Sequence, residues 1–141
     1  MGDAVRGREK RVSIEPMLSV RNGKAAVRFY KEAFAAAELM YMESPDGAVV
    51  AKLEVGAPVG GAGGVFWVAD ESPEHANYSP ETLGGGTVRM VLVVADPDAV
   101  FARAVAAGGK AVWPVEDKEY GWRVGRLVDP FGHHWEIGRE L

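Results

Sequence analysis

An internal repeat constrains the fold of this chain more than any other feature of its sequence. The segment LSVRN at residues 18–22 aligns without gaps on LVVAD at residues 92–96, a shift of 74 positions. Each copy is followed by apolar residues at helical spacing and then by three runs that alternate as strands do. The order strand, helix, strand, strand, strand therefore occurs twice, which predicts an α+β protein built from two similar modules.

The first module is expected to cover residues 12–70. Residues 12–20 predict a strand, and residues 24–37 predict an amphipathic helix for which Asn22 is a suitable N-cap. Three further strands follow at residues 39–43, 48–55 and 65–69, the first two joined by the turn sequence Ser-Pro-Asp-Gly. A bend rich in glycine, residues 56–64, precedes the last of them.

The second module is expected to cover residues 87–141. It follows an irregular linker, residues 71–86, that is rich in Pro, Gly and Ser. The predicted elements are a strand at 87–95, a helix to Ala107 that Asp96 caps, strands at 110–115 and 122–128, and a closing strand from His133. Val100, Phe101, Ala104 and Val105 form the expected buried stripe of the helix. The two modules make one domain, residues 12–141, after a flexible tail at residues 1–11.

Composition excludes several classes of function. The net charge of −4 argues against a nucleic-acid partner, since phosphate neutralisation needs a concentrated basic surface. The absence of cysteine excludes disulfides, thiolate zinc sites and thiol nucleophiles. No apolar run is long enough for a bilayer and the N-terminus lacks a signal-peptide core, so a cytoplasmic protein without a membrane partner is expected.

The closing strand, DPFGHHWEIG at residues 129–138, contains the ionisable residues that first suggest a site. Side chains alternate along a strand, so His134 and Glu136 share one face while Trp135 and Ile137 share the other. The apolar pair favours the core, which leaves His134 and Glu136 facing solvent or a cavity. In the repeat, Trp67 is the counterpart of Glu136.

Four sequence strings carry a resemblance to a known family. They are FYKEAF at 29–34, DAVFARAVAAGG at 98–109, PVEDKEYGWR at 114–123 and DPFGHHWEI at 129–137. With the two βαβββ modules, they resemble the vicinal-oxygen-chelate superfamily, in its glyoxalase/bleomycin-resistance-like (PhnB-like) branch. The resemblance implies curved mixed sheets that form a cup, helices outside the cup, ligands inside it and a homodimer.

The resemblance also implies where metal-dependent members hold their ion. The matching positions here are Glu15, Trp67, Arg89 and Glu136. An indole is not a metal ligand, and a guanidinium is always protonated and has no lone pair to give. We therefore expect Arg89 to pair with Glu136, and with Glu15, in place of a cation, and no metal cofactor.

Two main functional hypotheses follow. In the first, the protein is not an enzyme and has no catalytic residues; it binds a small organic molecule, such as an antibiotic or other natural product, and sequesters it. The expected ligand-binding residues are Glu15, Met17, Trp67, Arg89, Val91, Tyr120, Trp122, His134 and Glu136. Acidic residues near the mouth of the cup, Glu116, Asp117 and Glu119, favour a cationic or amphipathic ligand.

The alternative is a metal-dependent glyoxalase-like lyase or isomerase. There Glu136, Glu15 and His134 would hold a divalent ion such as Ni, Zn, Mn or Fe. A third possibility is a scaffold whose cup is filled and inert.

Overall fold

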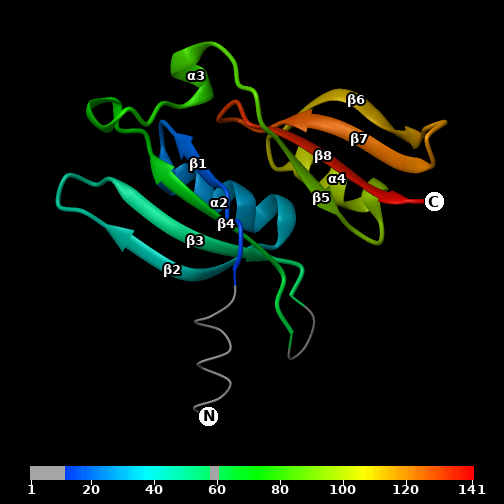
Figure 1. Ribbon diagram of the computed structural model, residues 1–141, viewed down its shortest axis with the longest axis horizontal. Helices are drawn as coiled ribbons and strands as arrows, with labels where there is room; N and C mark the ends of the chain where they lie inside the picture. Colours follow the sequence, from blue (N-terminus) through cyan, green and yellow to red (C-terminus); the bar gives the residue numbers. More distant parts are fainter. Residues whose placement is uncertain (1–11, 58–60) are drawn as a thin grey trace.

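The computed structural model describes residues 12–57 and 61–141, and it shows two four-stranded mixed sheets with their helices (Figure 1). The first module contains β1 (Met17–Val20), α2 (Gly23–Phe34), β2 (Ala37–Glu43), β3 (Val49–Val55) and β4 (Gly64–Asp70). The second contains β5 (Arg89–Val93), α4 (Pro97–Ala106), β6 (Lys110–Asp117), β7 (Trp122–Val128) and β8 (His134–Glu140). Between them lie η1 (Pro73–His75) and α3 (Pro80–Leu83). The α+β class and the repeated order of elements are confirmed.

The two sheets have the same topology. Their strand orders are β1-β4-β3-β2 and β5-β8-β7-β6, so the first and last strand of each module lie side by side and run parallel. The remaining pairs are antiparallel. The sheets are not closed into one barrel; they lie on the two sides of the molecule, with α2 and α4 packed against each other (Figure 1).

Side-chain caps fix the starts of the two long helices, as the sequence predicts. The Asn22 side chain accepts a hydrogen bond from the amide of Ala25 at 3.1 Å, and Asp96 accepts one from Ala99 at 3.2 Å. Each bond satisfies an amide that has no partner within its helix. The capped helices direct their apolar faces into a single core that the two modules share.

Aromatic residues from both modules meet in that core. Trp135 of β8 packs against Tyr30 and Phe34 of α2 and against Phe66 of β4, with ring centroids 4.7–5.5 Å apart. Ile137 lies beside them without exposure. The prediction that Trp135 and Ile137 face the core is therefore confirmed, and Phe66 packs there with them.

Asp129 joins the two modules through a buried hydrogen-bond network. Its Oδ2 accepts from the Tyr30 hydroxyl at 2.5 Å and from Trp135 Nε1 at 2.9 Å. Its Oδ1 accepts from the amides of Phe131 and His133 at 2.9 and 3.0 Å. Burial first, and the neighbouring Asp129 carboxylate second, raise the pKa of Tyr30 well above its ordinary value, so the hydroxyl remains a donor.

Several predicted boundaries are wrong. The first strand begins at Met17 rather than residue 12, and the first helix ends at Phe34, where Ala35 adopts a left-handed conformation with φ of 55°. The linker is not irregular throughout, because Ser79 caps α3 by accepting from the amide of Thr82. Val105 is 38% exposed and does not belong to the buried stripe of α4. The predicted tail, residues 1–11, lies outside the described residues.

Candidate functional site

Each sheet has an outer face, which we define as the face turned away from the helices. In both modules the core residues of the central strands face the helices, so the residues that alternate with them lie on the outer face. Across the first sheet, one row of this face is formed by Met17, Trp67, Lys52 and Met40. The corresponding row of the second sheet is formed by Val91, Glu136, Arg126 and Trp113. The two rows contain four of the predicted ligand-binding residues.

In the first module, Glu15 is held by a tryptophan and a lysine. Trp67 Nε1 donates to Glu15 Oε1 at 2.8 Å, and Lys52 Nζ lies 3.7 Å from the same oxygen. Lys52 also lies 5.4 Å from the centre of the Trp67 ring, a cation–π distance. Hydrogen bonds from Trp67, and then from Ser13, lower the pKa of Glu15, so the carboxylate is ionised. The predicted pairing of Glu15 with Arg89 is therefore wrong, because the partners of Glu15 are Trp67 and Lys52, two residues of the first sheet.

In the second module, the predicted pair of Arg89 and Glu136 is present. Arg89 Nε donates to Glu136 Oε2 at 2.6 Å. The Glu136 side chain is 19% exposed and that of Arg89 is 56% exposed. The guanidinium therefore covers the carboxylate that the resemblance assigns to a metal ion.

Arg126 is a site residue that the sequence analysis missed. It is directly opposite Glu136 on the neighbouring strand, and its guanidinium carbon lies 4.9 Å from the centre of the Trp113 ring. Its Nε is buried and has no hydrogen-bond partner among the described residues. The repeat could have identified Arg126, because Arg126 is the counterpart of Lys52 in the second module. Each of the two residues lies opposite a residue of the last strand of its own module, Trp67 for Lys52 and Glu136 for Arg126.

The two histidines of the closing strand have different surroundings. His134 is in register with Arg89 on the outer face, and its Nδ1 is buried without a partner in the described part of the chain. His133 Nε2 forms a 2.9 Å hydrogen bond with the carbonyl oxygen of Ser19, which ties the turn before β8 to β1. His75, in the linker, is largely exposed.

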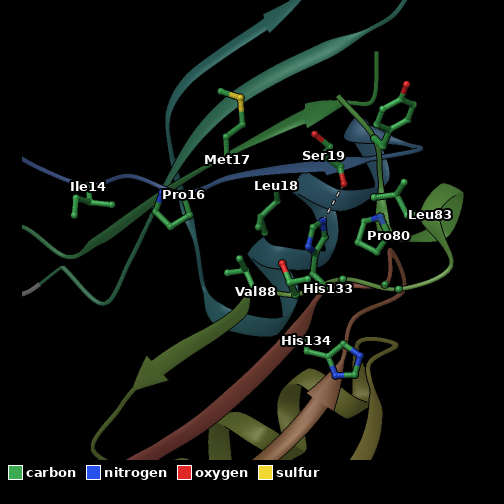
Figure 2. A pocket seen from close by; sticks show the side chains of 15 residues that line it. Ile14, Pro16, Met17, Leu18, Ser19, Pro80, Leu83, Val88, His133 and His134 are labelled. Carbon is green, nitrogen blue, oxygen red and sulfur yellow. Dashed lines mark hydrogen bonds between the residues drawn. The ribbon is translucent and has the colours of Figure 1, made fainter. Parts of the chain in front are cut away.

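A pocket of about 490 Å³ lies where the two modules meet (Figure 2). Met17 and His134 of the predicted set line it, together with residues that the sequence analysis did not single out: Ile14, Pro16, Leu18, Ser19, Tyr78, Pro80, Leu83, Val88 and His133. Figure 2 shows His133 between β1 and the linker, bonded to Ser19. Most of the lining is apolar, so the pocket extends the apolar part of the outer face around Met17.

The remaining predicted residues, Trp122 and Tyr120, lie at the start of β7 and in the turn before it. Trp122, at the start of β7, is partly buried on the outer face, whereas Tyr120 in the preceding turn is 70% exposed. The acidic residues nearby are largely paired. Asp117 accepts from Arg123 at 3.0 Å, and Glu116 accepts from Lys118.

The residues at the implied metal positions do not fit a metal ion. Within residues 12–57 and 61–141, no three His, Asp or Glu side chains gather in a way that could hold one. Glu15 is engaged by Trp67, and Glu136 by Arg89. A cation beside Glu15 would meet an indole N–H, and one beside Glu136 would meet a guanidinium; neither group can donate a lone pair.

Comparison with known proteins places the chain among glyoxalase-like folds. A model of the Glyoxalase/Bleomycin resistance protein/Dioxygenase superfamily matches residues 13–137. The protein Mb0911c of Mycobacterium bovis is 37% identical over 92% of this chain and 87% of its own length.

Two solved structures share the fold of this chain. TioX from Micromonospora sp. ML1 is 26% identical, with a TM-score of 0.66 over 92% of this chain and 97% of TioX. A gene product of Arabidopsis thaliana is 30% identical, with a TM-score of 0.68 over 92% of this chain and 99% of its own. No helix in the described ranges has the length and apolar character needed to cross a membrane.

Proposed function

Because the chain belongs to the glyoxalase/bleomycin resistance protein/dioxygenase superfamily, we propose that it binds a small organic molecule on the outer faces of its sheets without a metal ion. The main support for this proposal is the 2.6 Å contact between Arg89 and Glu136. A charged hydrogen bond of this length uses the carboxylate that would otherwise coordinate a cation. Removing the metal ligands leaves a surface for recognition rather than for Lewis-acid chemistry.

The outer faces suit a ligand with a flat apolar part. Trp67 and Trp113 offer rings for stacking, one in each module, and Met17 and Val91 add apolar surface, being 55% and 60% exposed. Most of the charged groups beside them are paired, Lys52 with Glu15 and Arg89 with Glu136. Such a site holds its ligand non-covalently, which suits sequestration of an antibiotic or other natural product.

We further propose that the protein is a homodimer. Met17, Val91 and Val93 are all more than half exposed, and they lie on the outer faces rather than scattered over the surface. Exposed apolar residues on these faces favour association. A second copy of the chain would cover part of it.

Two measurements test the proposed function. Protein purified without chelator is analysed for bound metals and then titrated with nickel and zinc by calorimetry. We expect no stoichiometric binding; tight binding that Glu136→Gln abolishes would favour the metal-dependent lyase or isomerase instead.

Ligand binding is tested with a panel of fused-ring aromatic compounds by calorimetry. We expect Trp67→Ala to weaken binding, since the indole would be a stacking surface. Tyr41→Ala is the matched control, because Tyr41 is an exposed aromatic residue of the same sheet whose register with Ala51 places it on the opposite face. Equal loss in both variants would contradict binding on the outer face, and no binding by any compound would contradict the proposal as a whole and favour an inert scaffold.

A further inference from the structure

The outer faces of the two modules differ in charge. In the first module the Lys52 ammonium lies 3.7 Å from the Glu15 carboxylate, so the two charges balance. In the second module Arg89 already pairs with Glu136. Arg126 is then a second cation beside a single carboxylate.

The geometry keeps Arg126 separate from that carboxylate. Arg126 and Glu136 are direct partners across β7 and β8, which ordinarily favours an ion pair. Yet Glu136 is bonded to Arg89, whereas Arg126 contacts the Trp113 ring and forms no salt bridge within the described residues. A guanidinium can stack on an aromatic ring and still donate hydrogen bonds from its edge.

Unpartnered buried polar atoms support a ligand at this position. In the described part of the chain, two buried side-chain nitrogens lack a hydrogen-bond partner, Arg126 Nε and His134 Nδ1. Both belong to the outer face of the second sheet: Arg126 is directly opposite Glu136 on β7, and His134 lies two residues before Glu136 on β8. Folded proteins rarely leave such groups unpaired, and those that remain are often functional.

The acidic loop near this face is less negative than its sequence suggests. Asp117 is bonded to Arg123, which also pairs with Asp98, and Glu116 is bonded to Lys118. These pairs neutralise two of the three acids that favour a cationic ligand. The unbalanced charge nearest the aromatic surface is therefore the positive charge of Arg126.

We infer that the outer face of the second module recognises a planar organic anion, with a carboxylate on the Arg126 guanidinium and an aromatic ring against Trp113. Bidentate pairing suits this choice, because the two oxygens of a carboxylate match two adjacent N–H groups of a guanidinium. The inference rests on the proposed function, since it names the chemical class of the ligand that the outer faces hold.

Three probes of one shape test the inference on the unmodified protein. They are 2-naphthoate, which is anionic; 2-naphthamide, which is neutral; and 2-naphthylmethylamine, which is cationic. Calorimetry in low-salt buffer at pH 7.5 gives the three affinities. We expect 2-naphthoate to bind about tenfold more tightly than the amide, the typical gain from a charge-assisted hydrogen bond, and the amine to bind most weakly.

Three variants locate the effect. Arg126→Gln should bring the ratio of the naphthoate and naphthamide affinities close to one. The control, Arg28→Gln, makes the same change of charge at an exposed position of α2 and should leave the ratio unchanged. Arg126→Lys keeps the charge but not the fork geometry, and we expect it to retain only part of the preference.

The outcomes separate this inference from the proposed function. Binding of the amide or the amine at least as tightly as 2-naphthoate would overturn the preference for an anion and leave small-molecule binding intact. An anion preference that persists in Arg126→Gln would overturn the assignment to Arg126. Failure of all three probes to bind would overturn both.

Discussion

The buried carboxylate of Asp129 gives the sharpest test of how the two modules are held together. It is 3% exposed and accepts four hydrogen bonds, two at each oxygen. In Asp129→Asn the amide oxygen can still accept from the two backbone amides if it takes the place of Oδ1. The amide nitrogen then replaces Oδ2, the oxygen to which Tyr30 and Trp135 donate.

The two donors at Oδ2 respond differently. The Tyr30 hydroxyl can rotate and accept a hydrogen bond from the new amide, whereas the Trp135 indole can only donate. One charged hydrogen bond is therefore lost and its donor is left buried, and the other is weakened. Since a hydrogen bond to a charged group contributes about 1.5–3 kcal/mol, we expect the free energy of unfolding to fall by about 3 kcal/mol.

Urea unfolding followed by circular dichroism measures this loss. With a slope of about 1–3 kcal/mol/M, a loss of about 3 kcal/mol lowers the midpoint by roughly 1–3 M without changing the slope. The control is Asp117→Asn, which weakens an exposed pair with Arg123 and should cost less than about 1 kcal/mol. A loss below about 1 kcal/mol for Asp129→Asn would refute the view that this network joins the modules.

Three further predictions concern the site, the packing and the assembly. In Trp67→Phe the Glu15 carboxylate loses its main hydrogen bond, so the pKa of Glu15, followed by NMR, should rise, and an unchanged pKa would contradict this assignment. Because the native pKa of Glu15 is lowered, the stability that this residue contributes is present above its unfolded pKa and is lost as the pH falls through its folded pKa. Gly138→Ala should lower the melting temperature, since its Cβ would lie 2.6 Å from the carbonyl oxygen of Arg123, whereas Gly86→Ala, with open space around it, should not. Sedimentation equilibrium at micromolar concentration should show a dimer that Val91→Glu weakens, and a monomer in the unmodified protein would contradict the proposed assembly.

Local signals made most of the fold predictable. The repeat fixed the order of elements, the caps Asn22 and Asp96 fixed the helix starts, and alternation correctly placed Trp135 and Ile137 in the core. The N-terminal strand was predicted too long because residues before Met17 alternate like a strand but lack strand pairing. The cap at Ser79 was present in the sequence, but the surrounding Pro and Gly suggested irregular structure.

The site was less predictable because its contacts join distant residues. The pair of Arg89 and Glu136 could be foreseen, since both match metal positions of the resembled family. Lys52 could not, because it reaches Glu15 only through the register of β3 and β4. Similarly, the isolation of Arg126 depends on which of two arginines Glu136 binds, and strand alternation does not decide that choice.

Because side chains alternate along β8, one set of its residues packs in the core and the other set forms part of the outer face. Trp135 and Ile137 are in the core, while His134 and Glu136 lie on the outer face beside Arg126 and Arg89. Substitutions at the second set change the chemistry of the surface while leaving the aromatic core intact. One strand can thus remain a constant folding element while its alternate positions are free to acquire new specificities, so variants selected for a different ligand should gather at these positions and spare the others.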